Sequence, residues 1–512
     1  MSGLDLAIVV VYFVVVLLVG LRFAGRQTST QAYFLAGRNI PGWVVAFSLV
    51  GTMIGSTTFV GHPGNVFDSD MWMMPFFLSL PLVMIFVSRR IVVLYRHRIR
   101  MSVYEYLERR FDYPARAYGA AAFIVSRVVD VSSTLYFLGI AVAFMVDVDA
   151  WWIILWVGLF TLAYTLLGGI QAVAWTDVLQ CILLLGGGLI CVGIALFQAS
   201  VGPGEVLQTA WEGGRFGWGS WDLSLTQRNA WILGVGGVIW ALQRFAAEQH
   251  MVQRYLTARS DGEATRATYV GAVACVPIWF LFMVLGALIW AFYQAPGNEL
   301  PTDVLTTKDD IVPYFIRTEC PPGLLGLIVA ALAAAAMSSL AADLNSLATV
   351  VVDDYYQRLC PQSTDRQRLR FGRAVVVVTG VAAILFAQQW IGVGSAIEFG
   401  VQLLSIATAG MLGLFGLGLL TTRATKQGAW AGIVSCVLFT CWATLTSVTL
   451  PAMQRPLLEL GTWNYTLDPF LIGILNHIVM VVVGYAVSLL TRRSAEDSVD
   501  LTIWAQHSEK KA

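Results

Sequence analysis

The sequence predicts an all-α integral membrane protein with about thirteen transmembrane helices, and three observations support this fold class. First, the chain of 512 residues is 57% hydrophobic and only 12% charged, whereas soluble domains carry about 25% charged residues. Second, its apolar residues fall in runs of the length, roughly 20 residues, that a helix needs to cross a bilayer. Third, basic residues gather in alternate connections between these runs, which is typical of multi-pass membrane proteins.

The apolar runs are the predicted transmembrane helices. The first run has no basic leader and no small-residue cleavage site, so we expect it to be retained and not removed as a signal peptide. In chain order the runs cover about residues 4–22, 40–62, 71–95, 119–146, 151–171, 177–199, 231–252, 267–292, 321–350, 373–391, 396–420, 427–449 and 469–491.

The basic residues predict which side of the membrane each connection faces. Arg22 and Arg38 follow the first run, and a dense group that includes Arg96 and Arg100 follows the third. The intervening connections are poorer in positive charge, and cytoplasmic loops carry the excess of Lys and Arg. We therefore predict a multi-pass protein of the plasma (inner) membrane, with its N-terminus outside and its C-terminus in the cytoplasm.

Charge and cysteine content narrow the possible partners. The formal net charge is zero, so the overall balance gives no indication of a nucleic-acid partner. The seven cysteines are odd in number and no pair has the spacing of metal ligands, so we predict neither a disulfide framework nor a zinc site. The expected partners are the lipid bilayer and small molecules, and no obligatory protein partner is evident.

Two predicted helices contain clustered glycines at membrane depth. Gly51 and Gly55 lie in the second run, and Gly234, Gly236 and Gly237 lie in the seventh. Glycine costs about 1 kcal/mol relative to alanine inside a helix, so each cluster indicates either an unwound segment or close helix packing. The two helices are five apart, and an odd block length inverts the second block in the membrane. Matching interrupted helices in inverted halves point to a binding site between them.

This symmetry divides the chain into six segments, none of which forms a separate soluble domain. They are an extra N-terminal helix with a cytoplasmic loop at 1–39, a first five-helix repeat at 40–199, an outer loop at 200–230, an inverted second five-helix repeat at 231–420, two C-terminal helices at 421–493 and a cytoplasmic tail at 494–512.

An apolar helix in the second half carries two adjacent hydroxyl groups. Ala335, Ser338 and Ser339 lie at positions i, i+3 and i+4, so one face presents a backbone carbonyl and two hydroxyls together. A membrane helix tolerates polar atoms mainly where another group, an ion or a water-filled cavity receives them. An uncharged cluster of oxygens suits a hard monovalent cation. Small residues and serines also allow close helix packing, which is the competing interpretation.

Ordered motifs in the chain resemble the sodium:solute symporter family, which includes sodium/sugar, sodium/sialic acid and sodium/proline carriers. The resemblance extends from about residue 3 to 493. It implies the inverted-repeat fold first described for the bacterial leucine transporter, with one extra N-terminal and two extra C-terminal helices. The matching motifs are Tyr33–Arg38, Tyr164–Ala172, Thr176–Gln180, Gln253–Leu256, Ala335–Ser339, Asn345–Ser346 and Asp353–Tyr355.

The resemblance also implies a site for sodium, the co-transported ion. Carried over residue by residue, the family's site falls on the backbone carbonyls of Gly51, Ile54 and Ala335 and on the hydroxyls of Ser338 and Ser339. Unwinding between Gly51 and Gly55 would free carbonyls for the ion, and two distant helices would then share it.

Two carboxylates are candidates for the ion path. Asp177 matches an acidic residue that family members place beside the inner sodium path, or it is a carboxylate at a helix start that the dipole favours. For Asp343 there are two alternatives: it acts in the release of the ion, or it pairs with a residue of another helix. Some members bind a second sodium at a further serine pair, but Ala341 and Ala342 occupy those positions, so we predict one sodium per cycle.

The solute-binding residues are less well defined by the sequence. Thr58, Phe77 and Met53 differ from the residues that the galactose and proline carriers have there, so neither pocket is copied. Arg127 either pairs with Asp130, three residues on, or faces the solute cavity. The candidates are Ser56, Thr57, Thr58, Phe77, Arg127, Gln243 and Gln402, with Arg244 and Glu398 as further polar groups and Phe76 and Trp240 as apolar walls.

These observations predict a sodium-coupled symporter that imports a small polar organic solute, a sugar or sugar acid being favoured, by alternating access. The alternatives are a sodium-coupled amino acid or monocarboxylate symporter, a solute sensor with a transporter fold, and a facilitator without ion coupling. An enzyme is disfavoured because no paired carboxylates, metal motif or Ser-His-Asp arrangement share a membrane depth. His250 and His477 are expected to be interfacial or structural.

Overall fold

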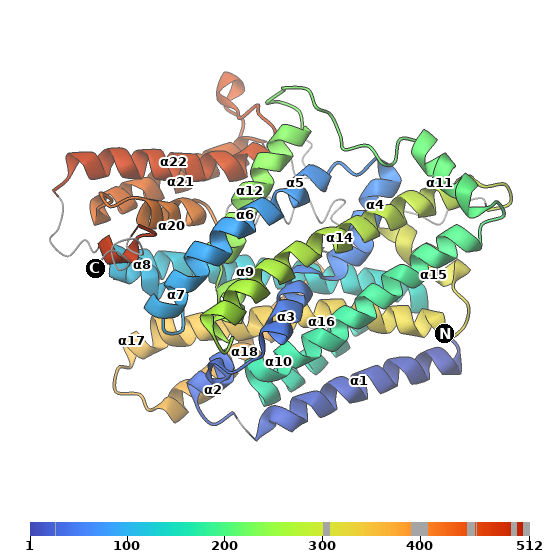
Figure 1. Cartoon of the computed structure of the whole chain (residues 1–512), viewed down its shortest axis with the longest axis horizontal. Coiled ribbons are helices and arrows are strands. Elements are labelled where there is room, and N and C mark those ends of the chain that lie inside the picture. Colours follow the sequence, from blue (N-terminus) through green and yellow to red (C-terminus); the bar gives the residue numbers. More distant parts are fainter. Residues whose placement is uncertain are drawn as a thin grey trace.

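The computed structural model of the chain describes residues 1–25, 27–298, 300, 308–390, 408–447, 456, 458–492 and 499–504, and its regular elements in these residues are helices (Figure 1). The first half contains α1 Gly3–Ala24, α2 Thr30–Leu35, η1 Ala36–Arg38, α3 Gly42–Met53, α4 Ser56–Asp68, α5 Met74–Leu78, α6 Leu80–Phe86, η2 Val87–Ile91, α7 Val92–Arg98, α8 Glu105–Arg110, α9 Tyr113–Val146, α10 Ala150–Phe197 and α11 Pro203–Glu212. The second half contains α12 Ala230–Ala246, α13 Gln249–Leu256, α14 Asp261–Gln294, η3 Lys308–Asp310, α15 Ile311–Glu319, α16 Leu324–Val350, η4 Val351–Tyr356, α17 Gln357–Leu359, α18 Asp365–Ala387, η5 Gln388–Trp390, α20 Met411–Leu420, α21 Lys426–Ser447, η6 Gly461–Trp463, α22 Phe470–Leu490 and η7 Val499–Leu501.

The prediction of an all-α membrane protein is confirmed. Nine described helices are long and apolar enough to cross a bilayer, and two bent helix pairs raise the number of described spans to as many as eleven. The α10 element has 48 residues, enough for about 72 Å of helix at 1.5 Å per residue. A bilayer core is about 30 Å thick, so α10 covers two of the predicted spans. The predicted span at 396–420 lies partly outside the described residues.

Gly169 breaks α10 between those two spans. Its φ of 54° lies in the left-handed region that side chains disfavour, and an added Cβ would lie 2.7 Å from the carbonyl oxygen of Tyr33. The break therefore precedes residue 177, where the sequence placed the next helix start. Asp177 accordingly lies inside a helix and is fully buried, so the prediction of a carboxylate at a helix start is wrong.

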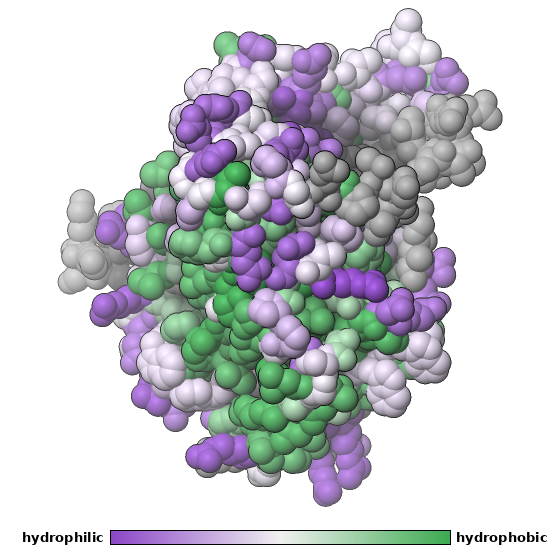
Figure 2. Space-filling model, turned by 90° about the vertical axis from the view of Figure 1, so that its right-hand side faces the viewer, coloured by the Kyte–Doolittle hydropathy of each residue, from purple (hydrophilic) through white to green (hydrophobic). Residues whose placement is uncertain are grey.

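Apolar side chains cover much of the outer surface. Figure 2 shows broad apolar areas on the end of the molecule that carries the N-terminus and α11, with hydrophilic side chains gathered near the top and along the margins. The α1 helix packs on α10 and α16 with one side and turns the other side outward. The outward apolar residues, which suit contact with lipid, include Leu4, Leu6, Val10, Val11, Val14, Leu18 and Leu21.

The predicted break in the second transmembrane segment is confirmed. Helix α3 ends at Met53 and α4 begins at Ser56, with a bend of 51° between them. Ile54 and Gly55 between the two helices have extended backbone conformations. The last carbonyl groups of an α-helix have no partner within the helix, so the end of α3 presents backbone oxygens inside the helix bundle.

The seventh transmembrane segment is broken at a different place from its glycine cluster. Helix α12 ends at Ala246 and α13 begins at Gln249, with a bend of 55°. The cluster lies about ten residues earlier, inside continuous helix. A Cβ on Gly237 would lie 2.1 Å from the carbonyl oxygen of Phe76 in α5. Gly237 therefore serves close packing, and of the two interpretations that the sequence left open for this cluster, the unwound segment is wrong.

This contact predicts opposite effects for two matched substitutions in α12. Gly237→Ala forces α12 away from α5, and overpacking of this kind costs about 1–3 kcal/mol. Gly234→Ala is the control, because its Cβ meets nothing closer than an oxygen at 3.9 Å and alanine favours the helix by about 1 kcal/mol. Thermal unfolding of the purified variants measures both. A Gly237→Ala protein as stable as Gly234→Ala contradicts the close contact.

Helix α16 lies at the centre of the bundle and contacts α1, α3, α9 and α10 (Figure 1). At the start of α16, the backbone amides of Gly323 and Gly326 donate hydrogen bonds to the Asp5 side chain of α1, at 2.7 and 2.8 Å. Further along, the Tyr164 hydroxyl of α10 donates to the carbonyl oxygen of Met337 at 3.0 Å. These bonds fix the depth and rotation of the segment that carries Ser338 and Ser339.

Candidate functional site

The structure places the α3–α4 break beside the two serines of the predicted sodium site. A Cβ on Gly51 would lie 2.8 Å from the Ser338 Oγ, and one on Gly55 would lie 3.2 Å from the Ser339 Oγ. The break between α3 and α4 therefore faces the two hydroxyls of α16 directly. Ile54 and Ala335 are both 2% exposed.

The chemistry of these residues fits an alkali-metal ion. The five predicted oxygens come from backbone carbonyls and hydroxyls, none of which is charged, and hard cations take oxygen ligands. No group of three or more His, Cys, Asp or Glu side chains within the described residues has the arrangement of a metal site. The uncharged set of oxygens is therefore a candidate site for a monovalent cation.

Asp177 lies directly behind this cluster and orients one of its hydroxyls. Its carboxylate accepts hydrogen bonds from Ser338 at 2.6 Å and from Ser48 in α3 at 2.5 Å. A hydroxyl that donates its proton to a carboxylate keeps its lone pairs for another partner. Asp177 thus holds the Ser338 oxygen as an acceptor toward the α3–α4 break.

A buried arginine balances the charge of Asp177. Arg254 in α13 is 1% exposed, and its Nη2 lies 3.4 Å from the Asp177 carboxylate. None of its three side-chain nitrogens makes a hydrogen bond to a described residue. The ion pair with Asp177 is thus its closest charge interaction, and it joins the second broken helix to the candidate sodium site.

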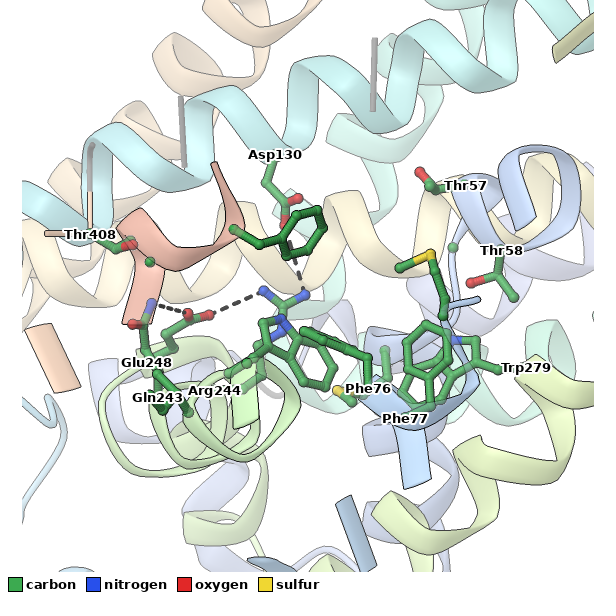
Figure 3. Close-up of a pocket in the computed structure, with 18 of the residues that line it drawn as sticks. Thr57, Thr58, Phe76, Phe77, Asp130, Gln243, Arg244, Glu248, Trp279 and Thr408 are labelled. Atoms are coloured by element: carbon green, nitrogen blue, oxygen red, sulfur yellow. Dashed lines mark hydrogen bonds and ion pairs between the residues drawn. The ribbon is translucent and has the colours of Figure 1, made fainter. Parts of the chain in front are cut away.

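A cavity of about 440 Å³ opens beside the same break (Figure 3). Ser339 of the candidate sodium site lines the cavity, and so does Gly55, whose Cβ would lie 3.2 Å from the Ser339 Oγ. Aromatic rings form one wall: Phe77 stacks on Trp279 with 4.1 Å between ring centroids, and Phe76 lies 5.2 Å from Trp240. The cavity therefore places a solute next to the ion, with an apolar wall on one side.

Only some of the predicted solute-binding residues line the cavity. Ser56 is fully buried and donates a hydrogen bond to the carbonyl oxygen of Thr134 at 2.9 Å, so it does not line the cavity. Gln402 and Glu398 lie outside the described residues. The predicted residues that line the cavity are Thr57, Thr58, Phe77, Arg127 and Gln243.

Arg127 combines the two arrangements that the sequence left open. It lines the cavity, yet its side chain is only 1% exposed, and it pairs with Asp130 at 2.8 Å. It also lies 3.4 Å from Asp343 and 3.5 Å from Glu248. Asp343 thus takes part in pairing between α16 and α9, the second of its two predicted roles.

The C-terminal helices also contribute polar groups that the sequence did not single out. Thr444 in α21 and Asn476 in α22 line the cavity, and the Thr444 Oγ1 and the Asn476 Oδ1 have no hydrogen-bond partner among the described residues. His477 lines the cavity as well. The adjacent Asn476 and His477 in an apolar run were the available signal, because polar residues in a membrane helix usually face the bundle or a cavity.

Two broken helices, an oxygen cluster at one break and a cavity beside it define a secondary transporter. The profile of the sodium:solute symporter family matches residues 33–435, and the chain belongs to this family. Sodium is therefore its co-transported ion, as the sequence predicted.

Known relatives agree with this assignment. The chain is 30% identical to the sodium/sialic acid symporter NanT of Aliivibrio fischeri over 504 residues, which cover 96% of this chain and 94% of the relative. It is 32% identical to the sodium/sialic acid symporter SiaT of Proteus mirabilis, with coverages of 85% and 88%. The sodium/glucose cotransporter of Vibrio parahaemolyticus is 27% identical, with coverages of 90% and 88%.

Solved structures confirm the predicted leucine-transporter-like fold. A substrate-bound, outward-open structure of a Na⁺-coupled sialic acid symporter superposes with a TM-score of 0.86 at 28% identity, covering 97% of this chain and 99% of that chain. The nucleobase-cation-symport transporter Mhp1 in a closed conformation gives a TM-score of 0.59 at 14% identity, with coverages of 92% and 97%, and shares the fold.

Proposed function

We propose that this symporter imports a small polar organic solute together with one sodium ion per cycle. The observation that supports the proposal is the shared border of the two sites: Ser339 belongs to the candidate sodium site and also lines the cavity, as does Gly55, which follows the predicted ligand Ile54. A solute in a cavity of about 440 Å³ would touch the segment that the ion organises. This volume lies within the range of about 300–1,000 Å³ typical of small-molecule sites.

In this proposal sodium and solute stabilise each other through the α3–α4 break. The ion binds the carbonyls of Gly51, Ile54 and Ala335 and the hydroxyls of Ser338 and Ser339, and it fixes the break against α16. Because coupling is reciprocal, sodium raises the affinity for the solute by the same factor as the solute raises the affinity for sodium. One charge moving inward across 100 mV adds about 2.3 kcal/mol to the driving force.

The direction of transport follows from the predicted orientation. With the N-terminus outside and the arginine-rich connections in the cytoplasm, sodium enters from the outside and leaves inward down its gradient. Sialic acid and glucose carriers among the relatives favour a solute of monosaccharide size, and amino acids and monocarboxylates are the alternatives of similar size.

Reconstitution of the purified full-length protein in proteoliposomes tests the coupling. Solutes are first found by sodium-dependent thermal stabilisation in a panel of sugars, sialic acid, amino acids and monocarboxylates. We expect an inward sodium gradient to drive uptake of the selected solute above its equilibrium level, and a matched potassium gradient to leave it at equilibrium. Equal uptake under the two gradients contradicts sodium coupling.

A further inference from the structure

Five charged residues form a cluster on one side of the solute cavity. Arg127 and Asp130 come from α9, Arg244 from α12, Glu248 from the α12–α13 break and Asp343 from α16. Arg127 contacts all three carboxylates within 3.5 Å. Arg244 lies 3.2 Å from Glu248 and 4.0 Å from Asp130, and Figure 3 shows it between these two groups. The charges thus form one continuous network.

The charge cluster has more negative than positive groups. Three carboxylates face two guanidinium groups, which leaves one excess negative charge among the described residues. His250 borders the cluster, with its Nδ1 3.6 Å from the Glu248 carboxylate, and we count it as the neutral ring that predominates at pH 7 for an ordinary imidazole. An uncompensated charge is costly away from water, so the cluster favours an incoming cation.

Both guanidinium groups of the cluster already pair with carboxylates of the protein, and the Nε atom of each, which lacks a hydrogen-bond partner among the described residues, is buried. Arg127 is 1% exposed, and Arg244 is 15% exposed and held between two carboxylates. A third arginine that lines the cavity, Arg228, lies over the rings of Trp72 and Phe470. Arg228 precedes α12, whereas Arg244 lies in the last turn of α12. Most of this helix, which is about 25 Å long, therefore separates Arg228 from the charge cluster.

Asp130 is the carboxylate that the solute can reach. Its side chain is 26% exposed, compared with 6% for both Glu248 and Asp343. The ring of Trp240 lies beside the cluster, since its centroid is 5.6 Å from the Arg244 guanidinium. Carboxylates pair with ammonium groups, and aromatic rings attract cations at this range.

We propose that the solute carries a positively charged ammonium group and that Asp130 binds it. The solute is then a cation or a zwitterion, and amine-free sugar acids and monocarboxylates are excluded. Thr444 and Asn476, whose side-chain oxygens lack partners among the described residues, would receive the uncharged polar part of the solute. This inference rests on the proposed function and names the solute class for the same cavity.

Matched pairs of solutes that differ by an amine test the proposal. The melting temperature of the purified full-length protein is measured in sodium or potassium with glucosamine against glucose, alanine against lactate, and glycine betaine against acetate. We expect sodium-dependent stabilisation only from ammonium-bearing members. Stabilisation and sodium-driven uptake of lactate, glucose or N-acetylneuraminate overturn this inference and leave sodium coupling intact, whereas uptake that ignores sodium contradicts the proposed function itself.

The variant Asp130→Asn tests the residue. In this variant the charge cluster has two positive and two negative groups, so we expect the protein to fold and to be stabilised by sodium in the absence of solute. The apparent affinity for the ammonium solute should fall at least tenfold. Asp147→Asn, at the exposed C-cap of the same helix, is the matched control and should change neither. Asp130→Glu restores the charge and should regain affinity. Unchanged solute affinity in Asp130→Asn overturns the proposal.

Discussion

Replacing both hydroxyls of the candidate sodium site, Ser338→Ala with Ser339→Ala, should raise the half-saturating sodium concentration at least about 100-fold. Interactions with a charged group contribute about 1.5–3 kcal/mol each, so the loss of two weakens binding by about 3 kcal/mol or more, and 1.4 kcal/mol corresponds to a factor of ten. The measurement is the melting temperature as a function of sodium concentration, with potassium chloride keeping the ionic strength constant.

A matched substitution in the same helix controls for loss of a buried hydroxyl. Ser346 is fully buried, but its hydroxyl donates to the carbonyl oxygen of Asp343 in its own helix at 2.9 Å. Ser346→Ala should therefore leave the sodium dependence unchanged. If the double variant binds sodium as the natural protein does, the hydroxyls are not ligands and the site is misplaced.

The second large effect is expected at Asp177. Asp177→Asn removes the only negative group within 4 Å of Arg254 among the described residues, and a buried charge left without its partner costs about 3–5 kcal/mol. The variant also keeps only one acceptor oxygen where Asp177 has two, so the hydroxyls of Ser48 and Ser338 can no longer both donate to this side chain. We expect a lower melting temperature in the absence of sodium and, in addition, weaker binding of the ion.

The double variant Asp177→Asn with Arg254→Met separates these two effects. Because neither charge remains, much of the lost stability should return, while sodium binding stays weak because Ser48 and Ser338 still share a single acceptor oxygen. Recovery of both stability and sodium affinity would show that Asp177 matters only as the counter-ion of Arg254. Failure to recover stability would contradict the assigned ion pair.

The sequence predicted the features that depend on local chemistry. Gly51 and Gly55 in an apolar run indicated the first break, and Ser338 and Ser339 at helical spacing indicated a polar face. The structure brings these two segments together at a Cβ distance of 2.8 Å from Gly51 to the Ser338 oxygen. Their meeting came from the family resemblance and not from spacing, because contacts between distant helices leave no periodic signal.

Other features depended on tertiary contacts and were missed. The second break lies at Ala247 and Glu248, without a glycine, where Glu248 joins the charge network with Arg127 and Arg244. Glycine clusters do not distinguish unwinding from close packing, and Gly237 serves the latter. Likewise, the i, i+3 spacing of Arg127 and Asp130 predicted one ion pair, but it did not indicate that Glu248 and Asp343 also lie beside Arg127.

The central claim is that sodium binds where the α3–α4 break meets α16. A high-resolution structure of the protein prepared in sodium and again in potassium tests it directly. We predict density for one ion, present only in sodium, in contact with the carbonyl oxygens of Gly51, Ile54 and Ala335 and the hydroxyls of Ser338 and Ser339. A sodium-specific ion bound elsewhere, with these five oxygens contacting only protein or water, would contradict the account.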